Sequence, residues 1–205
     1  LKIDFLGIRY LTMVSSIVEE IRKENPAFDI TKINYQDPKV YELFTKGKTE
    51  GIFQFESSGM KEKLNLLKPT EFNDIVAMNA LYRPGPMAQI EVYVRRKNKE
   101  EQVVYPHPHL EKILKDTYGV IVYQEQIMLI AVNFAHMSLN EADNMRRAVS
   151  KKKKEDLEYY GRIFVEKSVA AGYDLQVAKK LFDLIVTFAN YGFNKSHAVV
   201  YSMLA

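Results

Sequence analysis

Hydrophobic residues recur every three or four positions along most of the chain, which is the spacing of one face of an α-helix. Between residues 10 and 24 this face consists of Leu11, Val14, Ile17, Val18 and Ile21. Capping residues, prolines and glycines bound similar stretches further along the chain. These stretches predict helices over residues 38–46, 58–67, 71–81, 87–97, 124–135, 155–171 and 175–189, and a last helix capped by Ser196.

A second pattern alternates apolar and polar residues and predicts strands. In residues 1–8, the apolar positions Leu1, Ile3 and Phe5 alternate with polar ones, which is typical of a short strand. Residues 117–123 predict a short buried strand or an extended run. About ten helices against two or three short strands predict a mainly α (α+β) fold, in which short loops join the helices into one mass.

Asp4 is an unusual occupant of the first predicted strand, because aspartate is poor in strands. A carboxylate that projects from a strand is a common ligand for Mg²⁺ in phosphoryl transfer. The alternative interpretation is an exposed aspartate at the end of a strand.

A basic segment follows a strong signal for the start of a helix. Ser138 can cap that helix and Glu141 can complete a capping box. Leu139, Ala142, Met145 and Val149 then recur at helical spacing and predict a buried stripe. If the helix continues to Lys154, its opposite face is a row of cations that can bind phosphates; a solvated basic face is the alternative. The six cations are Arg146, Arg147, Lys151, Lys152, Lys153 and Lys154.

Two further segments carry candidate chemistry. Arg83 opens the sequence Arg-Pro-Gly-Pro, and two prolines and a glycine there predict a rigid turn. An arginine on a rigid turn is held ready for an anion, or it is an ordinary surface residue. Residues 191–197, YGFNKSH, offer an aromatic ring for stacking, with Asn194, Lys195 and His197 as polar contacts.

Composition limits the classes of protein. The 205 residues are 47% hydrophobic and 27% charged, with a net charge of +3, which indicates a globular chain with a real core. The absence of cysteine excludes disulfides, thiolate zinc sites and cysteine nucleophiles. No apolar run approaches the ~18 residues that a membrane span needs, and no signal peptide is visible. The chain opens without methionine and ends inside an apolar run, so we expect an excerpt of a longer polypeptide.

These segments share their wording and order with one protein family. The chain resembles, nearly from end to end, the α subunits of the bacterial replicative DNA polymerases of the C family, DNA polymerase III. The resemblance is closer to the widespread form of that subunit than to the form with an inserted exonuclease. It rests on LKIDFLGIRYLT, GIFQFESSGM, ALYRPGPM, TYGVIVYQEQIM, EADNMRRAVSKKK and FANYGFNKSHAVVYS.

The resemblance implies two parts and their roles. Residues 1–8 would end a nucleotidyltransferase-like palm, and residues 9–205 would be a multi-helix fingers domain, truncated at its C-terminus. Asp4 would be a catalytic carboxylate that holds two Mg²⁺ with upstream aspartates absent from this sequence. The remaining implied roles are binding of the incoming dNTP by Arg146, Arg147, Arg83, Asn194, Lys195 and His197, and binding of DNA by Lys151, Lys152 and Lys153.

The resemblance also implies partners and a location. These are primer–template DNA, dNTPs, and a sliding clamp and other replisome subunits bound through regions outside this chain, in the bacterial cytoplasm at the nucleoid and without a membrane. One carboxylate cannot assemble a two-metal site, so we expect this piece alone not to polymerise. The competing interpretations are a non-catalytic helical module that binds nucleic acid, another nucleotidyltransferase with a different acceptor, and a purely structural helical scaffold.

Overall fold

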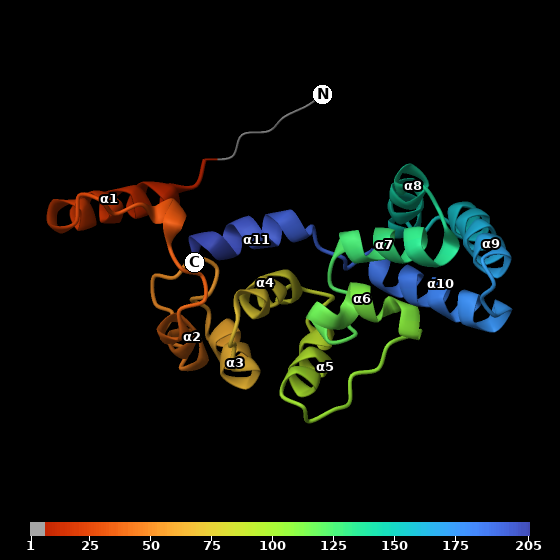
Figure 1. Cartoon of the computed structure of the whole chain (residues 1–205), viewed down its shortest axis with the longest axis horizontal. Coiled ribbons are helices and arrows are strands. Elements are labelled where there is room, and N and C mark those ends of the chain that lie inside the picture. The colour runs from red at the N-terminus through yellow and green to blue at the C-terminus, as the bar shows by residue number, and fades with distance from the viewer. Residues whose placement is uncertain (1–6) are drawn as a thin grey trace.

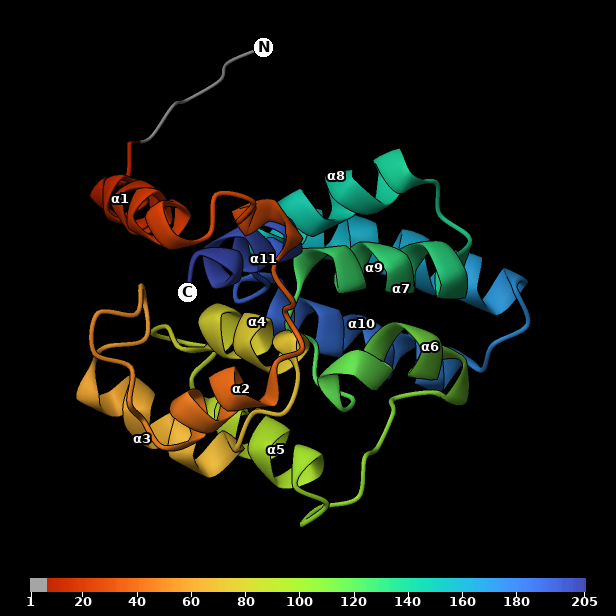
Figure 2. The same cartoon turned by 60° about the vertical axis from the view of Figure 1, so that its left-hand side comes forward.

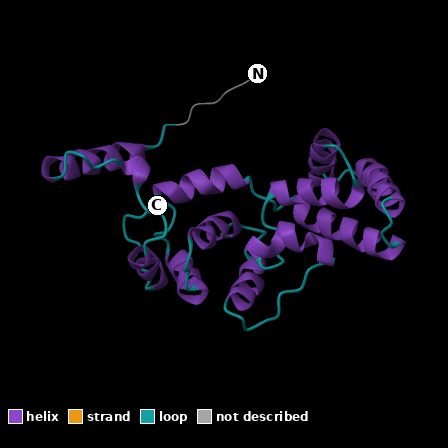
Figure 3. Ribbon diagram, in the orientation of Figure 1, coloured by secondary structure: helices purple, strands orange, loops and turns teal. Residues whose placement is uncertain are grey.

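Helices make up most of the described part of the chain. The computed structural model describes residues 7–205, and within that range Figure 3 shows helices and loops, with no strand. This confirms the mainly α fold. The predicted strand over residues 1–8 falls almost entirely outside the described residues. The α-helices are α1 (Arg9–Glu24), α2 (Pro38–Thr45), α3 (Ser58–Leu67), α4 (Phe72–Leu81), α5 (Ala88–Lys97), α6 (Glu111–Leu114), α7 (Gln124–Ala135), α8 (Leu139–Ser150), α9 (Lys154–Ala170), α10 (Leu175–Ala189) and α11 (Lys195–Leu204), and the short 3₁₀ helices are η1 (Ile30–Lys32), η2 (Pro108–Leu110) and η3 (Lys115–Thr117).

The helices enclose two hydrophobic cores. The first core lies among α2, α3, α4, α5 and α11, and contains Phe55, Leu64, Met78 and Tyr93. The second core lies among α6, α7, α8, α9 and α10, and contains Ile127, Phe134, Phe164 and Ile185. Figures 1 and 2 show α7 to α10 gathered in one bundle, with α11 leading from it across α4.

One short extended segment, residues 120–123, connects the two cores. Val120, Val122 and Tyr123 belong to the first core, whereas Ile121 belongs to the second. The Phe193 amide donates to the Val122 carbonyl at 3.0 Å, and the Gln124 amide donates to the Phe193 carbonyl at 2.9 Å. This is a single parallel bridge. The extended run predicted over residues 117–123 is therefore confirmed only for this part, and a 3₁₀ turn, η3, precedes it.

The side chain of Gln126 fixes this linking segment. Its Oε1 accepts from the amides of Val122 and Tyr123, both at 2.9 Å. Its Nε2 donates to Thr117 Oγ1 at 2.8 Å and to the Ile113 carbonyl at 3.2 Å. Gln126 is only 6% exposed, so water cannot readily replace these bonds.

The start of the basic helix is as predicted, but its end is not. The Glu141 carboxylate accepts from the Ser138 amide at 2.7 Å and Ser138 Oγ accepts from the Glu141 amide at 3.2 Å, which forms the capping box. α8 ends at Ser150, and Lys152 has a left-handed φ of 52°. The prediction that the six cations form a row along one helix face was wrong, because this turn separates α8 from α9.

Two smaller predictions are also corrected. Ala142, Met145 and Val149 form the buried stripe of α8, but Leu139 is 62% exposed because it lies in the first turn, outside the second core. The last helix is capped by Asn194, not by Ser196, because Asn194 Oδ1 accepts from the His197 amide at 2.8 Å.

α1 has the predicted amphipathic pattern, yet its apolar face is largely uncovered. Val18 is buried, whereas Leu11, Ile17 and Ile21 are exposed. The Tyr10 ring stacks on Phe53 with 5.0 Å between centroids, and Figure 1 shows α1 set apart from the other helices. No helix within residues 7–205 has the length and apolar character that crossing a membrane requires.

The basic residues at the end of α5 have structural partners. The Asp74 carboxylate is fully buried, and Lys97 Nζ lies 3.4 Å from its Oδ2. Arg95 and Arg96 both pair with Glu101, at 3.0 Å and 2.8 Å. These cations therefore hold α5 to its surroundings.

The role of Gln126 is testable by shortening its side chain. Replacing Gln126 with alanine would leave the buried amides of Val122 and Tyr123 without an acceptor, at about 1–3 kcal/mol each. We expect Gln126→Ala to lower the free energy of unfolding by about 2–5 kcal/mol, measured by urea denaturation. Gln176→Ala, at an exposed position of α10, is the control, and equal losses in the two variants would contradict this assignment.

Candidate functional site

The predicted arginine turn and the predicted polar bend meet in space. Residues 190–194 form the bend between α10 and α11. Arg83 Nη2 donates to the Tyr191 carbonyl at 2.8 Å, and Arg83 Nε donates to the Ala80 carbonyl at 2.7 Å. The guanidinium lies 4.3 Å from the centroid of the Phe193 ring, and partial burial lowers the pKa of Arg83. Arg83 thus shapes the bend and lines it at the same time.

The turn after Arg83 depends on a glycine. Gly85 has a φ of 103°, a conformation that L side chains rarely adopt. A Cβ atom at this position would lie 2.4 Å from Cε1 of Tyr191. The Tyr191 ring therefore packs directly on the backbone of the turn, and a methyl group at position 85 would force it to shift.

The first turn of α7 holds the other side of the bend. Gln124 Nε2 donates to the Gly192 carbonyl at 3.1 Å. The Glu125 carboxylate accepts from Asn194 Nδ2 at 2.9 Å and from the Lys195 amide at 3.0 Å. Both ends of the Asn194 amide are thus engaged, because its oxygen caps α11.

The cationic and aromatic side chains of the bend lie in this frame. Lys195 Nζ is 5.3 Å from the centroid of the Tyr123 ring. Burial raises the pKa of Tyr123, and the nearby Glu125 carboxylate adds to this shift. His197 is exposed and stacks on Tyr201, with 4.1 Å between ring centroids. The start of α11 thus carries a lysine packed against Tyr123 and an imidazole stacked on Tyr201.

The two arginines of α8 share one carboxylate. Asp143 Oδ1 accepts from Arg146 Nη2 at 2.7 Å, and Asp143 Oδ2 accepts from Arg147 Nε at 2.7 Å. The hydrogen bond from Arg146 is the main reason that the pKa of Asp143 is lowered. The side chain of Arg146 is 15% exposed and that of Arg147 is 67% exposed. Arg147 is therefore the more accessible of the two to an anion in solution.

The lysine turn adjoins the bend. Lys151, Lys152 and Lys153 are all exposed in the connection between α8 and α9. With its amide oriented to suit its neighbours, Asn190 donates to the Ser150 carbonyl and accepts from Lys152 Nζ at 2.9 Å. The end of α8 is thereby fixed to the start of the bend, so the structure brings the lysine turn, the bend and the arginine turn together.

Asp4, the predicted catalytic and metal-binding residue, lies outside the described residues. Within residues 7–205, no group of three or more histidine, aspartate or glutamate side chains could hold a metal ion. The described part of the chain supplies cations and hydrogen-bond donors to the bend.

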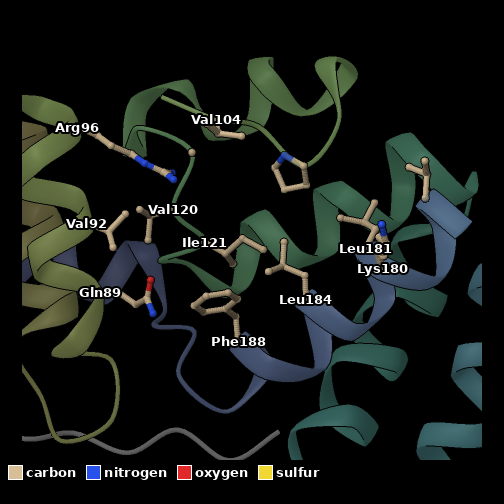
Figure 4. A pocket seen from close by; sticks show the side chains of 13 residues that line it. Gln89, Val92, Arg96, Val104, Val120, Ile121, Lys180, Leu181, Leu184 and Phe188 are labelled. Carbon is tan, nitrogen blue, oxygen red and sulfur yellow. The ribbon is translucent and has the colours of Figure 1, made fainter. Parts of the chain in front are cut away.

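A cleft of about 610 Å³ lies apart from these residues. It is bordered by α5, residues 104–106, residues 119–121 and α10. Figure 4 shows Val92, Ile121, Leu184 and Phe188 around it, with Arg96 at one side. None of the predicted site residues lines this cleft. We place the candidate site at the bend, because the converging polar groups are there.

Sequence reasoning did not single out the acids that hold these cations. Asp143 stands three and four residues before Arg146 and Arg147, and this helical spacing was a usable signal. Glu125 offered no such signal, because Asn194 and Lys195 are 69 and 70 positions away. Such a contact depends on the packing of α7 against the bend.

Comparison with known proteins gives a consistent result. The family described as "Bacterial DNA polymerase III alpha subunit finger domain" matches residues 10–172. The "DNA polymerase III subunit alpha" of Bacillus subtilis (strain 168) is 56% identical over 205 residues, which is all of this chain and 18% of that relative. Proteins of the same name from Halalkalibacterium halodurans and Staphylococcus aureus (strain COL) are 52% and 51% identical over 206 residues, again all of this chain, and 18% and 19% of their lengths are covered. The chain thus spans less than a fifth of the length of these relatives.

The contact between the arginine turn and the bend can be measured. Gly85→Ala would combine an unfavourable φ with a clash against Tyr191, whereas Gly172→Ala has a similar φ of 93° and no atom within 4 Å of the added methyl group. We expect Gly85→Ala to cost about 1–3 kcal/mol more in unfolding free energy than Gly172→Ala, measured by urea denaturation.

A double variant separates the clash from the backbone strain. Adding Tyr191→Ala to Gly85→Ala should recover part of the loss, as a coupling of about 0.5–3 kcal/mol. Strictly additive losses would contradict the packing of Tyr191 on the turn.

Proposed function

The chain belongs to the finger-domain family of the bacterial DNA polymerase III alpha subunit, and from this we propose that it is part of a DNA-directed DNA polymerase that extends a primer in chromosomal replication. The observation that carries the proposal is the similarity to alpha subunits over the whole chain. In this proposal, residues 1–8 end the palm and residues 9–205 form the fingers. The reaction is attack of the primer 3′-hydroxyl on the α-phosphate of a dNTP, with release of pyrophosphate.

The described residues would bind and orient the nucleotide. Arg147 is exposed and its planar guanidinium can donate to two phosphate oxygens at once. Arg146 is more buried and pairs with Asp143. It would also bind the triphosphate, through its positive charge. Arg83, Asn194, Lys195 and His197 would form the surface near the nascent base pair, where Arg83 and Asn194 act partly through the shape of the bend.

The exposed lysine turn would extend the positive field toward phosphates of the dNTP or the DNA. Lys151, Lys152 and Lys153 gather in one turn beside the bend, and clustered cations bind a phosphate backbone by displacing its counterions. The partners proposed for the parent protein are therefore primer–template DNA and dNTPs, with the sliding clamp and other replisome subunits bound elsewhere, in the bacterial cytoplasm at the nucleoid.

Asp4 is the residue of this chain that we propose as a Mg²⁺ ligand, together with carboxylates outside this sequence. Two bound Mg²⁺ ions would activate the 3′-hydroxyl and neutralise the leaving group. The chain contributes one carboxylate to that site, so the 205-residue piece alone is expected not to polymerise.

The assignment of Asp4 is tested in the full-length parent protein. Asp4→Asn removes the negative charge that would hold a metal ion but keeps the size of the side chain. We expect incorporation of dNTPs on a primed template to be abolished, while binding of primer–template DNA, measured by fluorescence anisotropy, stays near the wild-type value.

Asp183→Asn, at an exposed position of α10, is the matched control and should retain incorporation. Normal incorporation by Asp4→Asn would contradict the palm assignment. An inactive wild-type protein that still binds DNA would instead favour a non-catalytic nucleic-acid-binding module.

The role of Arg147 is tested by the dependence of incorporation on dNTP concentration. Loss of a hydrogen bond between charged groups costs about 1.5–3 kcal/mol, so Arg147→Ala should raise the KM for dNTP roughly tenfold or more. Arg147→Lys keeps the charge without the planar fork and should fall in between. Arg162→Ala, at an exposed position of α9, should leave the KM unchanged, and an unchanged KM in Arg147→Ala would refute the contact.

A further inference from the structure

We propose that Glu125 is a positioning residue that holds the bend between α10 and α11 in the conformation that binds the incoming nucleotide. This inference rests on the proposed function. Glu125 is negatively charged and would not bind a triphosphate itself. It would act through Asn194 and Lys195, which it holds.

The Glu125 carboxylate accepts hydrogen bonds from two neighbouring residues, Asn194 and Lys195. Its Oε1 accepts from Asn194 Nδ2 at 2.9 Å and from the Lys195 amide at 3.1 Å, and its Oε2 accepts from the same amide at 3.0 Å. Glu125 is half-buried in the first turn of α7. Both carboxylate oxygens therefore face the bend.

These bonds decide how α11 begins. Asn194 can cap α11 only while its Oδ1 points at the His197 amide, and the bond from its Nδ2 to Glu125 selects that orientation. The Lys195 amide belongs to the first turn of α11 and would otherwise need another acceptor. Glu125 thus fixes the turn from which Lys195 and His197 project.

The neighbouring contacts hold a different part of the bend. Gln124 and Val122 bind the backbone of Gly192 and Phe193. Gln124 and Val122 therefore anchor residues 192 and 193. Glu125 anchors Asn194 and Lys195, which are two of the three proposed nucleotide contacts between residues 194 and 197.

The charge of Glu125 supports a positioning role. A carboxylate beside a triphosphate site opposes anion binding by repulsion. Glutamate supplies two acceptor oxygens to the bend, whereas glutamine supplies one acceptor and an NH₂ group that cannot accept from the Lys195 amide. The second acceptor oxygen is therefore the advantage of glutamate over glutamine at position 125.

Removing the carboxylate should lower the fraction of molecules whose bend is competent to bind. The apparent dissociation constant rises in inverse proportion to that fraction. In the full-length parent protein, we expect Glu125→Ala to raise the KM for dNTP about tenfold with less than about a twofold change in kcat. Glu125→Gln keeps one acceptor and should recover part of the loss.

Hydrogen exchange supplies a readout at the bend itself. The amides of Lys195 and His197 should exchange faster in Glu125→Ala than in the wild type, and Glu125→Gln should be intermediate. Glu158→Ala, at an exposed position of α9, is the matched control and should change neither the KM nor this exchange.

Three results would overturn the inference: an unchanged KM in Glu125→Ala, a lowered KM, which would make the carboxylate a competitor of the phosphates, or an equal rise in KM in the Glu158 control. Each of them leaves the proposed polymerase intact as long as the wild type incorporates dNTPs. Absence of incorporation by the wild type would refute the proposed function, and this inference with it.

Discussion

The hydrogen bonds of the Gln126 side chain hold the segment that connects the two cores. This side chain satisfies two buried backbone amides of the linking segment and binds Thr117 and the Ile113 carbonyl at its other end. The segment forms a single bridge, to Phe193, so its other buried amides need acceptors elsewhere, and unpaired buried amides are costly. The Gln126 side chain supplies the acceptor for the amides of Val122 and Tyr123. Residues 120–123 can therefore run extended between two helical cores and still pair with Phe193.

Acidic side chains hold the cations and the backbone of the candidate site in position through hydrogen bonds. Asp143 orients both arginines of α8, and Glu125 holds the backbone and the amide of the bend. The same principle is used structurally at the end of α5, where Asp74 holds Lys97. Such pairing reduces the local positive charge but restricts the conformations that each cation can adopt. Fixed positions matter for hydrogen-bond donors that must meet a ligand in one geometry.

Local signals predicted most of the helices, whereas contacts between distant segments decided what was missed. The bounds of α7 and the capping box of α8 follow from residues within one turn, and both were predicted. The end of α8 was not predicted, because lysine is a good helix former and the left-handed φ of Lys152 has no marker in the sequence. The roles of the site residues stay predictions, because Asp4 lies outside the described residues and no ligand contact fixes the roles of the others.

The pairing of Val122 with Phe193 has a consequence for the order of folding. The chain between these residues contains α7, α8, α9 and α10, the helices that make up most of the second core. During synthesis these helices can pack as soon as they emerge, but the bend cannot pair until α10 is complete and its loop is closed. The surface proposed for nucleotide binding is therefore expected to form late, after the helices of the second core have packed.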